Sequence, residues 1–244
     1  MKKASNKGFT LVELLVVIGI LGILMGALFP VISSAMLSAN LNTMSIQGRK
    51  LITGIVQANI DRQGKQDPLW PKDQDENSTD EGDQDIASKC STATDYFKAL
   101  FNMDKYGSTE WEPAVDGELL SALWGCGVPG MSGQTLEKKN IAWCIVKNVQ
   151  DETQDFIPVL VTRNVTVSEL NSKLSDFTGK DENKVTLGSA NSTPFSDKGF
   201  VLVRKSGAAE PIKKQYATYS VIFNRQAVKA PTGDNAKTLT FIEP

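Results

Sequence analysis

The chain has 244 residues, of which 26 are basic and 28 acidic, so its formal net charge is −2. This slight acidic excess argues against a protein that mainly binds nucleic acid through nonspecific charge attraction. The sequence has no histidine, which excludes His-based catalytic triads, His-ligated zinc and histidine pH switches. Its 3 cysteines have no C-x-x-C spacing, so zinc-binding and thioredoxin-like motifs lack support.

An apolar run extends from Phe9 to Phe29, and Glu13 is the only charged residue in it. A helix needs about 20 residues to cross the hydrocarbon core of a bilayer, so this run predicts a transmembrane helix. The preceding residues, 1–8, are basic and include no acidic residue. The positive-inside rule therefore predicts a cytoplasmic N-terminus, with the rest of the chain across the membrane.

The junction between the basic and the apolar segment has the sequence GFTLVELL, residues 8–15. It resembles the class III signal of type IV prepilins and type II secretion pseudopilins, in which the apolar stretch follows the cleavage site. In that family a membrane aspartic peptidase, the prepilin peptidase, cleaves after the glycine and methylates the new N-terminal residue. The resemblance implies cleavage between Gly8 and Phe9, and N-methylation of Phe9.

The resemblance extends from Lys7 to about Ala35, with Gly22 and Pro30 where family members carry a glycine and a helix-bending proline. It implies a filament subunit that prepilin peptidase processes and that assembles with other pilin or pseudopilin subunits. The implied location is the inner membrane, crossed once with the head in the periplasm, and afterwards a pseudopilus or a cell-surface filament.

Glu13 needs an explanation, because a carboxylate inside an apolar run is costly without a partner. Cleavage after Gly8 creates a positive α-amine on Phe9, about one helical turn from Glu13. This amine can neutralise the carboxylate within one helix or between neighbouring subunits. The resemblance implies the pairing between subunits, which sets the register of assembly. The alternative is a hydrated Glu13 at the level of the lipid headgroups, without a role.

The helix that begins at Phe9 is expected to continue to about Arg62, because apolar residues recur at spacings of three and four along its second half. Pro30 removes an amide donor and is expected to bend the helix. The stripe consists of Leu37, Leu41, Met44, Gly48, Leu51, Ile52, Ile55, Val56 and Asn59. The predicted parts of the chain are a leader at 1–8, a transmembrane or filament-core helix at 9–32, an amphipathic helical stem at 33–62 and a globular head at 63–244.

The head begins with an acidic stretch at 73–85 that lacks apolar periodicity. It fails the EF-hand pattern at the glycine and at the final glutamate, so an exposed loop is favoured over a calcium site. Ser91 or Thr92 can cap a helix that runs through Phe101, and residues 118–124 indicate another short helical stretch.

The second part of the head has the composition of a sheet. A short helix is expected at 167–174 and an irregular excursion at 179–197. Five segments are rich in β-branched and aromatic residues and are bounded by turn formers: 140–149, 156–163, 200–205, 216–223 and 238–242. A long helix laid on an antiparallel sheet is an α+β architecture, and the resemblance implies the same pilin-like fold.

Cys90 and Cys126 flank the first helical part of the head, which is expected to face an oxidising compartment, and they are the disulfide candidates. Cys144 lies in a strand-like run and is expected to be a small core residue. The alternative is three reduced, partly buried thiols.

Three classes of function compete. The junction at Gly8 favours a structural filament subunit of a type IV pilus or a type II secretion pseudopilus. The alternative is an adhesive or ligand-binding head displayed on such a filament, with Trp70, Trp111 and Trp124 as candidate contacts, although core packing explains each of them as well. An enzyme finds no support, because no spacing pairs a nucleophile with a base. No cofactor, metal or specific nucleic acid is expected, and secretion, surface and DNA-uptake filaments remain open.

Overall fold

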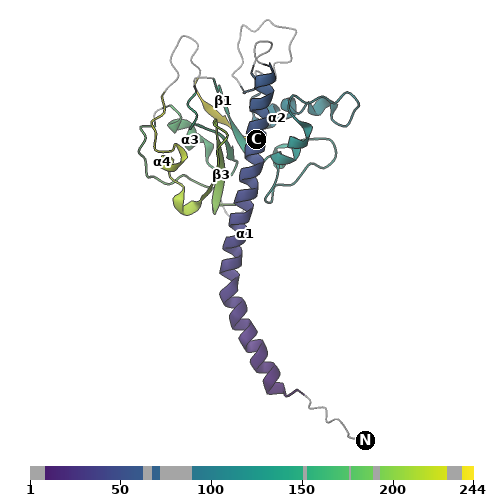
Figure 1. Ribbon diagram of the computed structural model, residues 1–244, viewed down its shortest axis with the longest axis vertical. Coiled ribbons are helices and arrows are strands. Elements are labelled where there is room, and N and C mark those ends of the chain that lie inside the picture. Colours follow the sequence, from purple (N-terminus) through teal and green to yellow (C-terminus); the bar gives the residue numbers. More distant parts are fainter. Residues whose placement is uncertain are drawn as a thin grey trace. The chain divides into compact units, whose positions relative to one another are not determined.

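The computed structural model describes residues 9–62, 68–71, 90–150, 153–175, 177–188, 193–229 and 238–244. By its internal contacts the chain divides into two compact units, Met1–Ala39 and Asn40–Pro244. Helix α1 runs without a break from Leu11 to Arg62 and contributes to both units (Figure 1). The long helix predicted from the sequence is thus confirmed, and Pro30 lies inside it without ending it.

Within the second unit, α1 buries one face against the rest of the head. Gly48 permits the closest approach, since a Cβ there would lie 2.7 Å from Cη2 of Trp143 and 2.7 Å from Cγ2 of Val203. Helix α1 therefore packs directly on strands β1 (Trp143–Lys147) and β3 (Gly199–Arg204). The buried residues of α1 follow the predicted stripe: Leu41, Met44, Gly48, Leu51, Ile52 and Ile55.

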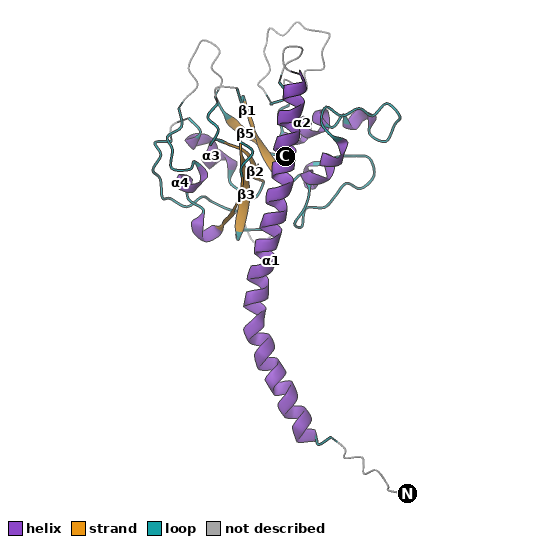
Figure 2. Cartoon of the chain, in the orientation of Figure 1, coloured by secondary structure: helices purple, strands orange, loops and turns teal. Residues whose placement is uncertain are grey.

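The sheet has 5 strands in the order β4-β3-β2-β1-β5, and every neighbouring pair is antiparallel. The other strands are β2 (Pro158–Thr162), β4 (Ala209–Lys213) and β5 (Thr240–Ile242). Figure 2 shows α1 on one face of the sheet, with α3 (Val167–Lys173) and α4 (Tyr219–Ile222) on the other. Because both faces are covered, β2 and β3 are buried along their whole length. The arrangement is the α+β, pilin-like fold that the sequence predicts.

One predicted strand is wrong, because residues 216–223 are mostly helical. Thr218 begins α4, and its Oγ1 accepts a hydrogen bond from the N–H of Val221 at 3.4 Å. At the other end the guanidinium of Arg204 donates to the carbonyl oxygens of Ile222, at 2.7 Å, and Val221, at 3.2 Å. These contacts satisfy backbone groups at both ends of the short helix, so they override the strand preference of its β-branched and aromatic residues.

Strand β4 is missing from the prediction because its sequence, AEPIK, does not alternate in the manner of a strand. It lies at the edge of the sheet and pairs only with β3, Pro211 opposite Val201. An edge position tolerates proline, because the missing N–H leaves no interior ladder bond unmade.

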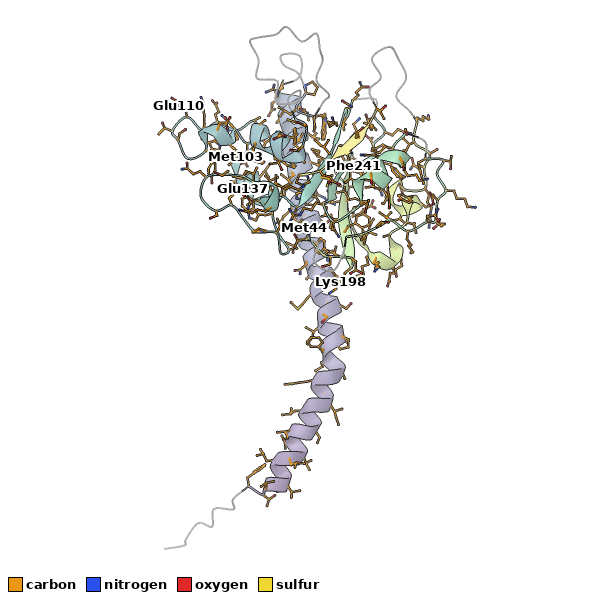
Figure 3. The ribbon with its side chains drawn as sticks, turned by 180° about the vertical axis from the view of Figure 1, so that it is seen from behind. Met44, Met103, Glu110, Glu137, Lys198 and Phe241 are labelled. Carbon is orange, nitrogen blue, oxygen red and sulfur yellow. The ribbon has the colours of Figure 1, made fainter. Side chains whose placement is uncertain are left out.

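The connection between α2 (Ala93–Leu100) and β1 is built from turns and short 3₁₀ helices, and we call it the 101–142 segment. Thr92, one of the two caps that the sequence offers, begins α2 and forms a capping box with Asp95. Figure 3 labels Met103 and Glu110 in the 101–142 segment and Met44 on α1. The 3₁₀ helices of the head are η1 (Met103–Lys105), η2 (Gly117–Leu123), η3 (Lys138–Asn140) and η4 (Lys214–Tyr216).

The structure contains no disulfide between Cys90 and Cys126, in contrast to the expectation from the sequence. The Sγ of Cys126 instead donates to the carbonyl oxygen of Asn40 at 3.3 Å. Cys144 is 1% exposed and is the core residue that the sequence predicts.

The distance along α1 explains why the two candidate cysteines do not meet. Cys90 lies near Tyr96, and burial together with this neighbour raises the pKa of the Tyr96 hydroxyl. That hydroxyl donates to the carbonyl oxygen of Leu69 at 2.9 Å, and the N–H of Leu69 donates to Asn59 at 2.6 Å. Asn59 is about five helical turns, or about 28 Å, from Asn40 along α1. A disulfide spans only about 6 Å between Cα atoms, so the fold holds the two thiols apart.

Candidate processing and assembly site

The predicted scissile bond lies at the boundary of the described residues. Gly8, like the rest of the leader, lies outside them, and Phe9 is the first residue on the other side. Phe9 is not helical, and 74% of its surface is exposed. A peptidase must bind the chain around the scissile bond in an extended form, so the non-helical, exposed Phe9 fits the role of the residue that follows the cut.

Glu13 has a partner at the start of its own helix, Thr10, which the sequence prediction does not include. One of its carboxylate oxygens, Oε2, accepts hydrogen bonds from the backbone N–H of Thr10 at 2.9 Å and from the Thr10 hydroxyl at 2.7 Å. The N–H of Glu13 donates back to Oγ1 of Thr10 at 3.3 Å. This reciprocal pair is a capping box at the start of α1, and the Thr-x-x-Glu spacing was the signal for it.

The second carboxylate oxygen of Glu13, Oε1, has no hydrogen-bond partner among the described residues. The capping box therefore occupies one side of the carboxylate and leaves the other side open to a further donor. A carboxylate can accept about four hydrogen bonds, so the cap and an external partner are compatible.

The part of α1 that belongs to the first compact unit is predominantly apolar, with Glu13 as its only charged residue. Its large apolar side chains, from Leu11 to Met36, are between 45% and 79% exposed. Among the described residues, α1 contains the segment that is long and apolar enough to cross a membrane. This finding supports the predicted single-pass membrane anchor.

Two of the three candidate tryptophans line the same cavity of the head, and the third is a core residue. Trp70 is only 7% exposed and belongs to the core. Trp111 and Trp124 are half-buried and line one cavity of the 101–142 segment, together with Tyr106. Among the described residues, no cluster of three or more cysteine and carboxylate side chains could hold a metal ion. The acidic stretch at 73–85 lies outside the described residues.

The comparisons with known proteins agree with the N-terminal geometry. A family described as the prokaryotic N-terminal methylation motif matches residues 3–29. A comparison with curated proteins and one with solved structures gave no match. The motif belongs to structural proteins that prepilin peptidase processes and that assemble into filaments. The chain therefore carries the signature of type IV pilins and pseudopilins, and this signature marks it as a pilin-like precursor.

Proposed function

We propose that the chain is a structural subunit of a type IV pilus or a type II secretion pseudopilus, and that it is not an enzyme. Prepilin peptidase removes the leader at 1–8 by cleaving between Gly8 and Phe9, and it methylates the amine of Phe9. The observation that carries this proposal is the exposed, predominantly apolar helix at 11–36, which begins within the methylation motif and has Glu13 as its only charged residue.

A helix that is apolar all round must be covered on all sides. The lipid bilayer covers residues 11–36 before assembly, and the corresponding helices of neighbouring subunits cover them in the filament core. Lipid tails are about as apolar as leucine side chains, so moving this helix from lipid to helices brings little hydrophobic free energy. Glu13, the only charged residue of this segment, then has a large influence on where the helix docks.

The open oxygen of Glu13 supports a role in assembly. Cleavage turns the amide of Phe9 into a positive α-amine, and the Oε1 of a neighbouring subunit's Glu13 accepts a hydrogen bond from it. Opposite charges attract strongly where water is excluded, and an unpaired charge there is costly. The pair therefore favours one register of the incoming helix over its neighbours.

The structure of the head is also compatible with a filament subunit. Residues 40–244 form one compact unit that includes the second half of α1, so a single continuous helix joins the head to the membrane anchor. The proposed location is the inner membrane, with the N-terminus in the cytoplasm and the head in the periplasm, followed by the filament. The proposed partners are prepilin peptidase and other pilin or pseudopilin subunits.

Mass spectrometry of the N-terminus tests the proposal directly. Chain extracted from membranes of cells with prepilin peptidase is expected to begin at N-methylated Phe9, and chain from cells without the enzyme is expected to keep the leader. Gly8→Ala is expected to slow cleavage, and Gly8→Arg to block it, because a small residue is needed beside the scissile bond. An intact leader in cells with active peptidase would contradict the proposal, as would the absence of mature chain from every sheared-filament fraction.

A further inference from the structure

A cavity of about 580 Å³ opens on the 101–142 segment, within the head and apart from the processing site. Its aromatic lining comes from Tyr106, Trp111 and Trp124, and its acidic lining from Asp116 and Glu118. Among the described residues, no lysine or arginine lines it. The cavity thus combines aromatic faces with negative charge and has no positive charge of its own.

Two of the aromatic rings form a fixed corner. The rings of Tyr106 and Trp111 lie 5.0 Å apart between centroids, at an interplanar angle of 84°. The Nε1 of Trp111 donates to the carbonyl oxygen of Phe101 at 2.7 Å. A Cβ on Gly117 would lie 2.5 Å from Cη2 of Trp111, so the absence of a side chain there makes room for the indole. The corner is therefore ordered before any ligand arrives.

Trp124 adds a third aromatic side chain, just after η2. A Cβ on Gly130 would lie 3.3 Å from its Nε1, so the indole rests against this glycine. Trp124 is half-buried, and its Nε1 donates to no acceptor among the described residues. Trp143, by contrast, is fully buried, and its Nε1 donates to the carbonyl oxygen of Ala122. Part of the Trp124 indole thus stays accessible to a ligand.

The two carboxylates are not neutralised by the protein. Asp116 caps η2, accepting the N–H of Glu118 at 2.9 Å, and this leaves its charge in place. Neither Asp116 nor Glu118 forms an ion pair with any described residue. The lysine closest to the cavity in sequence, Lys105, pairs with Glu110 instead, at 3.4 Å.

We propose that this cavity binds a quaternary ammonium group of the choline type. The faces of tryptophan and tyrosine attract such a cation through their ring quadrupoles. Its methyl groups need no hydrogen bonds and bury well against aromatic surface, and the unpaired carboxylates complement its charge. A neutral sugar could stack on the aromatic faces but would bring no positive charge to pair with the carboxylates. An anion would be repelled by them. The head thereby gains a ligand site that does not depend on filament assembly.

Calorimetric titration of the full chain in a nonionic polyoxyethylene detergent tests the site. Choline chloride is the probe for the free cation, and glycerophosphocholine is the probe for the same group on a lipid headgroup. The expected result is saturable binding of at least one probe below about 10 mM. The control ligand is 3,3-dimethylbutan-1-ol, which has the shape of choline without its charge and is expected to bind at least about 10-fold more weakly.

Two exposed or half-buried positions allow variants that leave the core intact. Glu118→Gln is expected to weaken choline binding about 2- to 5-fold, and Trp124→Leu about 3- to 30-fold. The matched control is Glu112→Gln, an exposed acid that does not line the cavity, and it is expected to bind as the unchanged chain does. Equal binding of the neutral ligand would overturn the proposal, as would unchanged binding by both variants or no saturation by either probe up to about 50 mM.

Discussion

Gly48 on α1 lies directly against the indole of Trp143 on β1: a Cβ at this glycine would be 2.7 Å from Cη2 of the ring. Trp143 has no room to yield, because it is fully buried and its Nε1 donates to the carbonyl oxygen of Ala122 at 2.9 Å. This contact fixes how closely the stem half of α1 approaches the sheet.

Gly48→Ala is expected to destabilise the head by about 1–2 kcal/mol, since the cost of overpacking exceeds the gain in helix propensity. Gly54→Ala is the matched control on the same helix. Its Cβ would meet Cδ1 of Leu119 at 2.3 Å and Cγ at 3.8 Å, but this flexible side chain is half-buried and can rotate away, which the fully buried Trp143 cannot. Gly54→Ala is expected to be neutral or slightly stabilising. Urea unfolding followed by circular dichroism measures both, and equal midpoints for the two variants would contradict the tight contact.

The capping box allows the two roles of Glu13 to be separated. Glu13→Gln keeps a side chain that can complete the box but removes the charge, whereas Thr10→Ala keeps the charge but removes the box. If charge pairing with the Phe9 amine sets the register, the Glu13→Gln variant is expected to be cleaved and inserted normally but to assemble poorly. Thr10→Ala is then expected to assemble nearly as well as the unchanged chain.

Sheared-filament yield, or pseudopilus-dependent secretion, is the measurement for these two variants, beside an immunoblot for mature protein. Glu112→Gln, an exposed acid of the head, is the control and is expected to assemble normally. If instead the Glu13→Gln variant assembles and the Thr10→Ala variant does not, the role of Glu13 is to cap the helix and not to pair with the amine.

Thiol labelling tests the correction to the disulfide prediction. Oxidised chain is expected to yield three alkylated cysteines after unfolding. In the folded chain only Cys126 is expected to react, and slowly, because Cys90 and Cys144 are buried. Burial raises the pKa of the Cys126 thiol, so less reactive thiolate is present at neutral pH and labelling accelerates as the pH rises. A mass that corresponds to one alkylated cysteine instead of three would show that a disulfide forms after all.

Arg204 ties α4 to the sheet. Its side chain is 4% exposed and pairs with Glu210 through two bonds, at 2.7 Å and 2.9 Å, in addition to its bonds to backbone carbonyl oxygens. Arg204→Leu takes the guanidinium donor away from the carbonyl oxygens of Phe156 and Ile222, whereas that of Val221 keeps the N–H of Asn224. The variant is expected to cost about 2–4 kcal/mol of unfolding free energy. Arg49→Gln, at an exposed position of α1, is the control and is expected to change stability by less than about 0.5 kcal/mol.

The same Arg204→Leu variant reports on the segment that the sequence assigns to a strand. Without the guanidinium, the carbonyl oxygen of Ile222 at the C-terminal end of α4 loses its side-chain donor, and the helix is expected to fray there. Hydrogen exchange at Phe223 and Ile222, whose amides bond within α4, is the sensitive measurement. Unchanged protection there would show that α4 does not depend on the guanidinium of Arg204.

Local patterns in the sequence were sufficient for much of this protein. The methylation motif around Gly8 and Phe9 is formed by consecutive residues, so the sequence is enough to recognise it. The continuous helix and its buried stripe follow from the spacing of three and four between apolar residues. Apolar runs were enough for β1, β2, β3 and β5, because strands covered on both faces need little else to mark them. The Thr10–Glu13 box was also readable, since its spacing is local.

Only the tertiary structure decided the features that depend on distant partners. Residues 216–223 became helical because Arg204, far back in the sequence, supplies hydrogen bonds that no local pattern reveals. β4 needed the edge of a sheet to accommodate Pro211. Cys90 and Cys126 looked pairable in sequence, but connectivity depends on spatial separation, and α1 holds them at different heights. The cavity of the 101–142 segment likewise depends on the folded chain, which places Trp111 and Trp124 in one lining with Asp116 and Glu118.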